Sequence, residues 1–117
     1  MTAEKVTKRL IELCTKGKFL EAQRELYDQD IISIETDGSK TIGLSKMQVK
    51  EQRFLDNVEK IYKIELSEPL IAGNYFSVIL KMELDLKNIG RRKMEEICIY
   101  QVKNSKIVFE QFFRDVN

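Results

Sequence analysis

The clearest pattern in the sequence is an alternation of apolar and polar residues between residues 75 and 86. The apolar positions of this segment are Phe76, Val78, Leu80, Met82, Leu84 and Leu86. The intervening positions are largely polar, and a period of two is typical of a strand with one buried face. We therefore predict a long β-strand here, with one face in the core and the other largely in water.

Three turn signals divide the C-terminal half of the chain into long segments. They lie at residues 72–74, 88–90 and 104–105, about sixteen residues apart. The strands between them exceed the usual five or six residues, so the sheet must twist and bend, generally through bulges. Pro69, the only proline, is expected at a bulge or edge position in a strand over residues 61–71. The pattern predicts a four-strand antiparallel meander.

The last two strands are predicted to form a hairpin around Asn104 and Ser105. Asparagine tolerates the left-handed backbone of a tight turn, and both flanks are rich in β-branched and aromatic residues. A two-residue loop places Val102 opposite Ile107. Continued without a break, this register pairs Tyr100 with Phe109, Cys98 with Gln111 and Glu96 with Phe113 on one face, and Glu95 with Arg114 on the other.

Helical periodicity marks the N-terminal part of the chain. A first helix, capped by Thr2 and stopped by Gly17, presents one apolar stripe. That stripe consists of Val6, Leu10, Leu13 and Cys14. A second helix from Phe19 is closed by Tyr27, and residues 28–30 are predicted to form a turn before a strand over residues 31–35.

A third helix is predicted from a capping box at Ser45 and Gln48 to about Asn57, after a loop over residues 37–40. The order of elements is therefore three helices with one strand among them, then the meander. This order indicates an α+β fold, with three N-terminal helices packed in the concave face of a strongly bent, mainly antiparallel sheet. At 117 residues, the chain is predicted to form one domain, residues 1–117.

Composition narrows the classes of function. A formal net charge of +1 argues against a general binder of nucleic acid or anionic lipid, and the apolar run over residues 76–80 is far too short to span a membrane. Because the chain contains no histidine, Ser-His and Cys-His nucleophile pairs and imidazole metal ligands are excluded, and we expect no metal and no cofactor. Cys14 and Cys98 are expected to be free thiols, and no charged-then-apolar leader opens the chain, which predicts a cytoplasmic location.

Four segments together resemble the SnoaL-like branch of the nuclear transport factor 2-like superfamily. They are residues 14–19, 25–35, 94–96 and 106–113, which occur in the family's order over nearly the whole chain. The resemblance implies a cystatin-like cone with a pocket between sheet and helices, and often a dimer formed through the outer face of the sheet. The turn at Asn104 and Ser105 departs from relatives, which usually have Asp-Gly or Asn-Gly there.

The same superfamily includes ketosteroid isomerases, whose catalytic positions can be compared with this sequence. In an ungapped alignment, Glu35 occupies the position of the isomerase carboxylate that moves the proton. The two oxyanion-hole positions correspond to Leu10 and Cys98, of which the first donates no hydrogen bond and the second donates weakly. This departure argues against steroid isomerisation. Fold alone does not decide whether the protein is an enzyme.

Two interpretations of Glu35 remain open. It is either a general base whose pKa is raised by burial, or a strand-end glutamate that faces water or pairs with a lysine. Around it we expect a pocket for a small apolar organic ligand. The pocket residues expected from the register and the resemblance are Leu10, Cys14, Tyr62, Met82, Glu96, Cys98, Tyr100 and Gln111. Catalysis there would be acid/base work of an isomerase, cyclase or dehydratase type, with a tyrosine or Glu96 assisting.

The outer face of the hairpin suggests a second role. In the predicted register Ile97, Ile99, Val108 and Phe112 lie there, more apolar residues than a solvated sheet needs. We expect these four residues to form a homodimer interface. The alternative function is a non-catalytic interaction module that uses this outer face and has no substrate.

Overall fold

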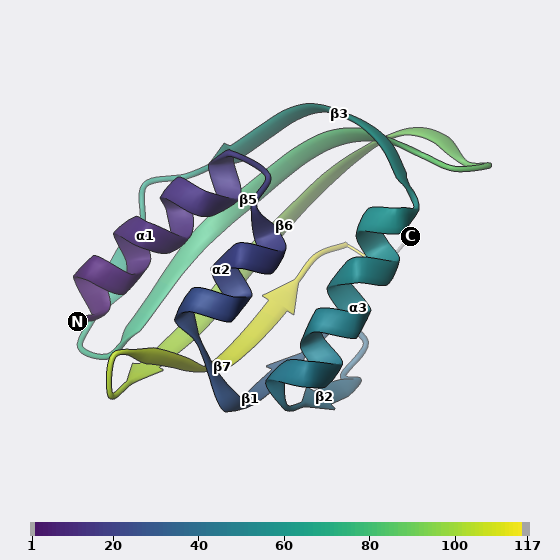
Figure 1. Ribbon diagram of the computed structural model, residues 1–117. Coiled ribbons are helices and arrows are strands. Elements are labelled where there is room, and N and C mark those ends of the chain that lie inside the picture. Colours follow the sequence, from purple (N-terminus) through teal and green to yellow (C-terminus); the bar gives the residue numbers. More distant parts are fainter. Residues whose placement is uncertain (1, 116–117) are drawn as a thin grey trace.

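Three helices cover the concave face of a strongly bent sheet in the computed structural model, which describes residues 2–115 (Figure 1). The helices are α1 (Ala3–Thr15), α2 (Phe19–Leu26) and α3 (Leu44–Asp56). The strands are β1 (Tyr27–Ile34), β2 (Lys40–Ile42), β3 (Val58–Leu66), β4 (Leu70–Ala72), β5 (Tyr75–Leu86), β6 (Gly90–Lys103) and β7 (Lys106–Phe113). The predicted α+β fold, with its helices on the concave side, is therefore confirmed.

The sheet is mainly antiparallel. Its strand order is β2-β1-β7-β6-β5-β3, and β4 pairs with β5 beside this path. Only the β1–β7 pair is parallel among the pairings of the described residues. This pair joins the first strand of the chain to the last, so residues far apart in sequence become neighbours in the sheet.

The start of the chain folds as its periodicity predicts. The Thr2 hydroxyl oxygen accepts a hydrogen bond from the backbone N–H of Lys5 at 3.2 Å, which caps α1. Gly17 takes a φ of +77° just beyond the helix, where a side chain would be strained. Leu10 is among the fully buried residues on the inner face of α1.

The start of α3 differs from the prediction, because Gly43 and not Ser45 is its N-cap. Gly43 has a φ of +100°, its N–H donates to the carbonyl of Ile31 at 2.8 Å, and its own carbonyl accepts from Met47. No side chain caps this helix. The position requires a left-handed backbone between β2 and the helix, which favours glycine over a capping hydroxyl.

Other boundaries were also predicted wrongly. Residues 28–30 are not a turn but part of β1, although the Asp28 carboxylate does accept the N–H of Asp30 at 2.9 Å. Pairing between β1 and β7 is irregular between Tyr27 and Ile32, which accommodates this local bend. The sequence pattern also missed β2, and it merged β3 and β4 across Pro69, which lies in the gap between them.

The terminal hairpin follows its predicted register only beside the turn. Val102 pairs with Ile107 as expected, and Asn104 and Ser105 take φ values of 51° and 67°. The next pair is Gln101 with Phe109, so Val108 is an extra residue and forms a bulge. Beyond the bulge, Tyr100 pairs with Glu110, Ile99 with Gln111 and Cys98 with Phe112.

This bulge overturns several predictions, because one extra residue exchanges the two faces of a strand. Phe112, predicted to lie outside, faces the helices together with Glu110, which the unbroken register also places outside, whereas Gln111 lies on the outer face. Glu95 pairs with Lys81 across β5 and not with Arg114, whose backbone N–H donates to Thr36. Phe112 is therefore not part of the outer face on which a dimer was predicted.

The core lies between the helices and the sheet, where inward side chains of α1, α2, α3, β1, β5, β6 and β7 meet. Ile31, Phe76 and Ile107 are among its fully buried members. No helix within residues 2–115 is both long enough and apolar enough to cross a membrane.

Candidate functional site

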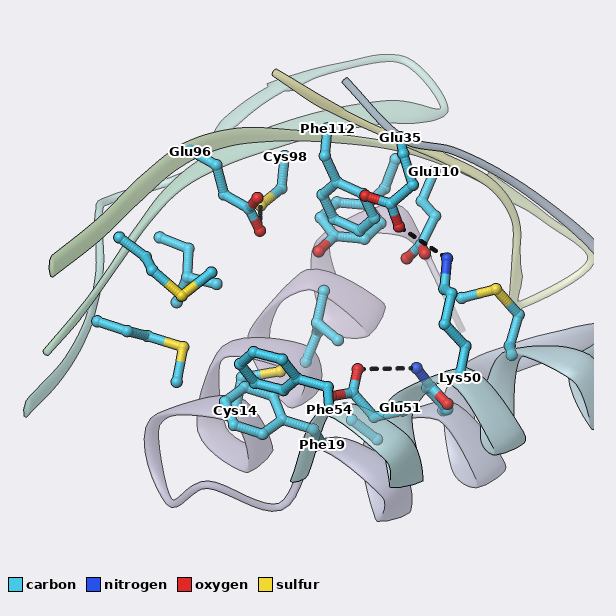
Figure 2. Close-up of a pocket in the computed structure, with 18 of the residues that line it drawn as sticks. Cys14, Phe19, Glu35, Lys50, Glu51, Phe54, Glu96, Cys98, Glu110 and Phe112 are labelled. Carbon is cyan, nitrogen blue, oxygen red and sulfur yellow. Dashed lines mark hydrogen bonds and ion pairs between the residues drawn. The ribbon is translucent and has the colours of Figure 1, made fainter. Parts of the chain in front are cut away.

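A cavity of about 460 Å³ opens between the sheet and the helices (Figure 2). This volume falls within the range of small-molecule sites. Most of its wall is apolar, contributed by Leu10, Phe19, Ala22, Met47, Phe54, Leu66, Leu80, Met82, Met94 and Phe112. The bent sheet forms one side and α1, α2 and α3 form the other, so the cavity results directly from the curvature of long strands.

The structure brings six of the predicted pocket residues to this cavity. They are Leu10, Cys14, Met82, Glu96, Cys98 and Tyr100. Tyr62 and Gln111 are not among the lining residues. Tyr62 is on the outer surface of β3, where its hydroxyl donates to Asp85 at 2.6 Å and the Arg91 guanidinium lies 3.8 Å from its ring centre. Gln111 is displaced by the bulge at Val108, which turns its side chain to the outer face.

Glu110 is the most deeply buried charged residue beside the cavity, with 1% of its surface exposed. Its carboxyl group accepts hydrogen bonds from the Tyr27 hydroxyl and from Ser33 Oγ, the latter at 2.7 Å. Burial raises the pKa of Glu110 to about 7, since a charged carboxylate is poorly solvated there, while the two hydroxyl donors and Lys50 act against this rise. At neutral pH this carboxyl group can therefore both release and accept a proton.

Glu35 lies at the end of β1, where it lines the same cavity and pairs with Lys50 of α3. Lys50 Nζ is 2.7 Å from Glu35 Oε1, and about a third of each side chain is exposed. Figure 2 shows the Lys50 ammonium group turned toward Glu35, with Glu110 beside them. This ion pair is the contact that the second interpretation of Glu35, a strand-end glutamate paired with a lysine, predicts.

Two further carboxyl groups reach the cavity from opposite walls. Glu51 projects from α3, and burial is the main reason that its pKa rises to about 7. Its carboxylate accepts a long hydrogen bond of 3.4 Å from Gln23. Glu96 projects from β6, and burial likewise raises its pKa, while the Cys98 thiol contacts it only weakly at 3.8 Å.

The thiols and tyrosines of the cavity are held in their neutral forms. Burial raises the pKa of Cys14 to about 12 and also raises that of Cys98, so neither supplies a thiolate nucleophile at neutral pH. The ring of Tyr100 stacks on Phe76 with ring centres 4.8 Å apart, and burial raises the pKa of its hydroxyl. Among residues 2–115 no group of three or more cysteine, aspartate or glutamate residues is arranged to hold a metal ion.

Sequence reasoning missed Glu51, Lys50, Tyr27 and Glu110 as cavity residues. For Glu51 a signal was available, because Met47, Glu51 and Phe54 are spaced i, i+4 and i+7 and so share one face of α3. For Glu110 there was no such signal. Its direction depends on the bulge, which the local sequence does not mark.

The family model for the SnoaL-like domain matches residues 1–114. The chain therefore belongs to the SnoaL-like domain family, as the sequence resemblance implied. None of the curated proteins matches this sequence.

Solved structures share the whole fold. A protein named as a SnoaL-like polyketide cyclase from Mesorhizobium loti is 27% identical, with a TM-score of 0.89, and the match covers 97% of this chain and 100% of that one. A nuclear transport factor 2-like protein of unknown function from Burkholderia pseudomallei is 11% identical, with a TM-score of 0.81, over 97% of this chain and 90% of that one. A ketosteroid isomerase-like protein from Catenulispora acidiphila, in complex with trimethylamine, is 13% identical, with a TM-score of 0.78, over 99% and 88% of the two chains. At 11% and 13% identity, the last two show the fold alone.

Proposed function

We propose that this protein binds a small, largely apolar organic molecule in the cavity and transfers a proton on it with Glu110. The observation that supports this proposal is the carboxyl group of Glu110, which is buried at the cavity, held by two hydroxyl donors and has a pKa raised to about 7. A general acid or base works best when its pKa is near the operating pH. The substrate class is an enolisable ketone or a cyclic ester, in keeping with the polyketide cyclase name of the Mesorhizobium loti relative.

The proposed step uses side chains of this chain alone. The Glu110 carboxylate removes a proton from the carbon next to a carbonyl group, and negative charge develops on the carbonyl oxygen. Tyr27 and Ser33 keep the carboxylate in place through their hydroxyl groups. Tyr100, whose neutral side chain lines the cavity, donates a hydrogen bond to the developing oxyanion. The proton then returns from Glu110 to another position of the substrate.

Glu35 has a supporting role in this proposal. Its carboxylate is engaged by the Lys50 ammonium at 2.7 Å, so it would have to give up this ion pair in order to take a proton. The pair also acts on Glu110, because Glu35 raises the pKa of Glu110 and Lys50 lowers it. We therefore assign proton transfer to Glu110 and electrostatic adjustment of Glu110 to the Glu35–Lys50 pair.

Exchange of substrate protons for deuterium tests this assignment without knowledge of the final product. The protein is incubated in D₂O with a panel of enolisable ketones and lactones, and exchange next to the carbonyl is followed by NMR. Glu110→Gln, which keeps the shape of the side chain, should lower the exchange rate of any accelerated substrate by about 10²–10⁴-fold. Glu35→Gln should lower it less, and Glu95→Gln, on the exposed part of β6, should leave it unchanged. Equal rates for Glu110→Gln and the parent would remove Glu110 from the mechanism, and loss of exchange in Glu35→Gln alone would make Glu35 the base.

We further propose that the outer sheet face forms a homodimer interface. Ile79 pairs with Ile97, and Ile97 pairs with Phe113, so the three side chains form a row across β5, β6 and β7. They are 38%, 48% and 44% exposed, respectively. An apolar row of this kind supports burial against a second copy. The interface expected from the sequence consisted of Ile97, Ile99, Val108 and Phe112. Ile79 and Phe113 join it, and Phe112 leaves it because it lines the cavity.

Sedimentation measures this second proposal directly. The parent should sediment as a dimer at micromolar concentration, and Ile97→Lys should sediment as a monomer with unchanged circular dichroism. A matched change on the other exposed surface, Val49→Lys of α3, should leave the dimer intact. A monomeric parent would contradict the proposed interface, and with it the alternative of a homodimeric interaction module.

A further inference from the structure

The cavity is lined by more acidic than basic residues. Lys50 is paired with Glu35, and Arg114 is the other basic residue among those of the described chain that line the cavity. Besides those of Glu35 and Asp37, three carboxyl groups line the cavity, those of Glu51, Glu96 and Glu110. Within residues 2–115, no lysine or arginine nitrogen lies within ion-pair distance of these three. The cavity therefore holds an excess of acidic groups in a mainly apolar wall.

Glu51 and Glu96 are the pair that a ligand can reach together. Glu51 extends from α3 on the helical side and Glu96 extends from β6 on the sheet side, with the cavity between them (Figure 2). Both residues line the same cavity, so a ligand that fills it can contact the two carboxyl groups at once. Like charges that face each other across a poorly solvated space are stabilised by a cation placed between them.

We propose that the molecule bound in this cavity carries a positively charged nitrogen, which is held between Glu51 and Glu96. This inference rests on the proposal that the cavity binds a small carbonyl compound, and it adds one group to that molecule: an amine on its apolar body. The rings of Phe19 and Phe54 lie beside Glu51 (Figure 2). They supply both apolar contact for the body of the ligand and aromatic faces that attract a cation.

The alternative occupant is a neutral molecule that accepts hydrogen bonds from protonated carboxyl groups. The two cases differ in the direction of their coupling to protons. A cation favours ionised carboxylates, so its binding releases protons and strengthens as pH rises from 6 to 8. A neutral acceptor needs protonated carboxyl groups, so its binding weakens over the same range.

The charged groups near Glu51 and Glu96 determine how a bound cation changes the pKa values of these two residues. Glu51 is acted on by Lys50, which lowers its pKa, and by Glu35 and Glu96, which raise it. Glu96 is acted on by Arg114, which lowers its pKa, and by Glu35, which raises it. Since burial is the largest cause of both shifts, an added cation would lower both pKa values toward the ordinary range.

Three probes with one apolar body and different charges test the inference. They are 4-phenylbutylamine, 4-phenylbutanol and 4-phenylbutanoate, whose binding to the full chain is measured by isothermal titration calorimetry at pH 6, 7 and 8. We expect the amine to bind about tenfold or more tightly than the alcohol at pH 8, as for hydrogen bonds to charged groups. Titrations in two buffers of different ionisation enthalpy at pH 7 should show that protons are released when the amine binds.

Single variants assign the effect to the two carboxyl groups. Glu51→Gln and Glu96→Gln should each weaken binding of the amine about tenfold at pH 8, leave binding of the alcohol unchanged and reduce the number of protons released. Glu68→Gln, an exposed glutamate between β3 and β4, is the matched control and should change none of these quantities. Circular dichroism confirms that the variants fold.

The possible outcomes separate this inference from the proposed function. If the alcohol or the carboxylate binds as tightly as the amine, or if binding of the amine takes up protons, the inference of a cationic ligand is wrong, whereas small-molecule binding stands. If none of the three probes binds at millimolar concentration, both proposals are overturned. Tight binding of the amine without an effect of either variant would also contradict the site between Glu51 and Glu96.

Discussion

The predicted pairing register holds in the half of the β6–β7 hairpin beside the turn and fails in the half beyond Val108. Beside the turn, Val102 faces Ile107 as simple counting from a two-residue loop predicts. Beyond Val108 the same counting is wrong by one residue, and Glu110 takes the inward position that had been predicted for Gln111. The comparison teaches that a turn sets register only locally, and that one extra residue decides which chemical groups reach the cavity.

The largest expected effect concerns the pH dependence of stability, because Glu110 is buried only in the shifted register. Its pKa rises from 4.5 to about 7 on folding, so the folded protein holds a proton that the unfolded chain releases between these values. The free energy of unfolding should therefore fall as pH rises through this window, by on the order of 3 kcal/mol for this group. Glu51, with a similar pKa, adds a second decline of the same sign.

Chemical denaturation at a series of pH values from 4 to 8 measures this decline. Glu110→Gln should remove a large part of it, because the amide does not titrate, while Glu51 and Glu96 keep their raised pKa values. Glu95→Gln, on the exposed part of β6, is the control and should preserve the full decline. If the decline is unchanged in Glu110→Gln, Glu110 is not buried, and the unbroken register that places it on the outer face is supported.

The second effect compares neighbouring residues on opposite faces of β7. Phe112 lines the cavity and packs edge-to-face on Tyr100, with ring centres 6.5 Å apart. Phe112→Ala should lower the free energy of unfolding by about 2 kcal/mol, and Gln111→Ala should change it by less than about 0.5 kcal/mol. Denaturant titration measures both, and the reverse order would support the unbroken register.

A smaller effect is expected from the hydroxyl group that holds Glu110. Ser33 Oγ donates to the carboxylate at 2.7 Å, and this bond lowers the pKa of Glu110. Ser33→Ala should therefore raise that pKa further and cost about 1 kcal/mol of stability at pH 8. NMR titration of the Glu110 carboxyl carbon measures the shift. As a control, Ser45→Ala in the exposed first turn of α3 should leave the titration unchanged. If Ser33→Ala also leaves it unchanged, Glu110 does not face β1.

The smallest effect belongs to the turn, where sequence and structure agree. Ser105 has a φ of 67°, a conformation that glycine adopts without strain. Ser105→Gly should stabilise the protein by about 0.5–1 kcal/mol, as measured by thermal unfolding, and leave the titration of Glu110 unchanged. A loss of stability would show that contacts of the serine side chain outweigh the backbone strain.

Different elements show how far the sequence alone could lead. The α1 cap at Thr2 and the alternation in β5 were predicted correctly, because caps and periodicity depend on residues a few positions apart. The start of α3 at Gly43 and the strand character of residues 28–30 were not, because both depend on how β1 meets β2 and β7. Within the site, Leu10, Cys14 and Met82 were found from elements whose faces are set locally.

By itself, then, the sequence determined the α+β class, the turn at residues 104–105 and the apolar faces of α1 and β5, since all of these are encoded by local spacing and composition, whereas the family was indicated by resemblance. The tertiary structure alone decided that Glu110 is buried and Gln111 is not, that Lys50 pairs with Glu35, and that Glu51 and Glu96 face each other across the cavity. The physical reason is that these arrangements join elements distant in the chain. The bulge at Val108 lies in the strand that pairs with both β6 and β1, so its position depends on contacts that a local pattern does not contain.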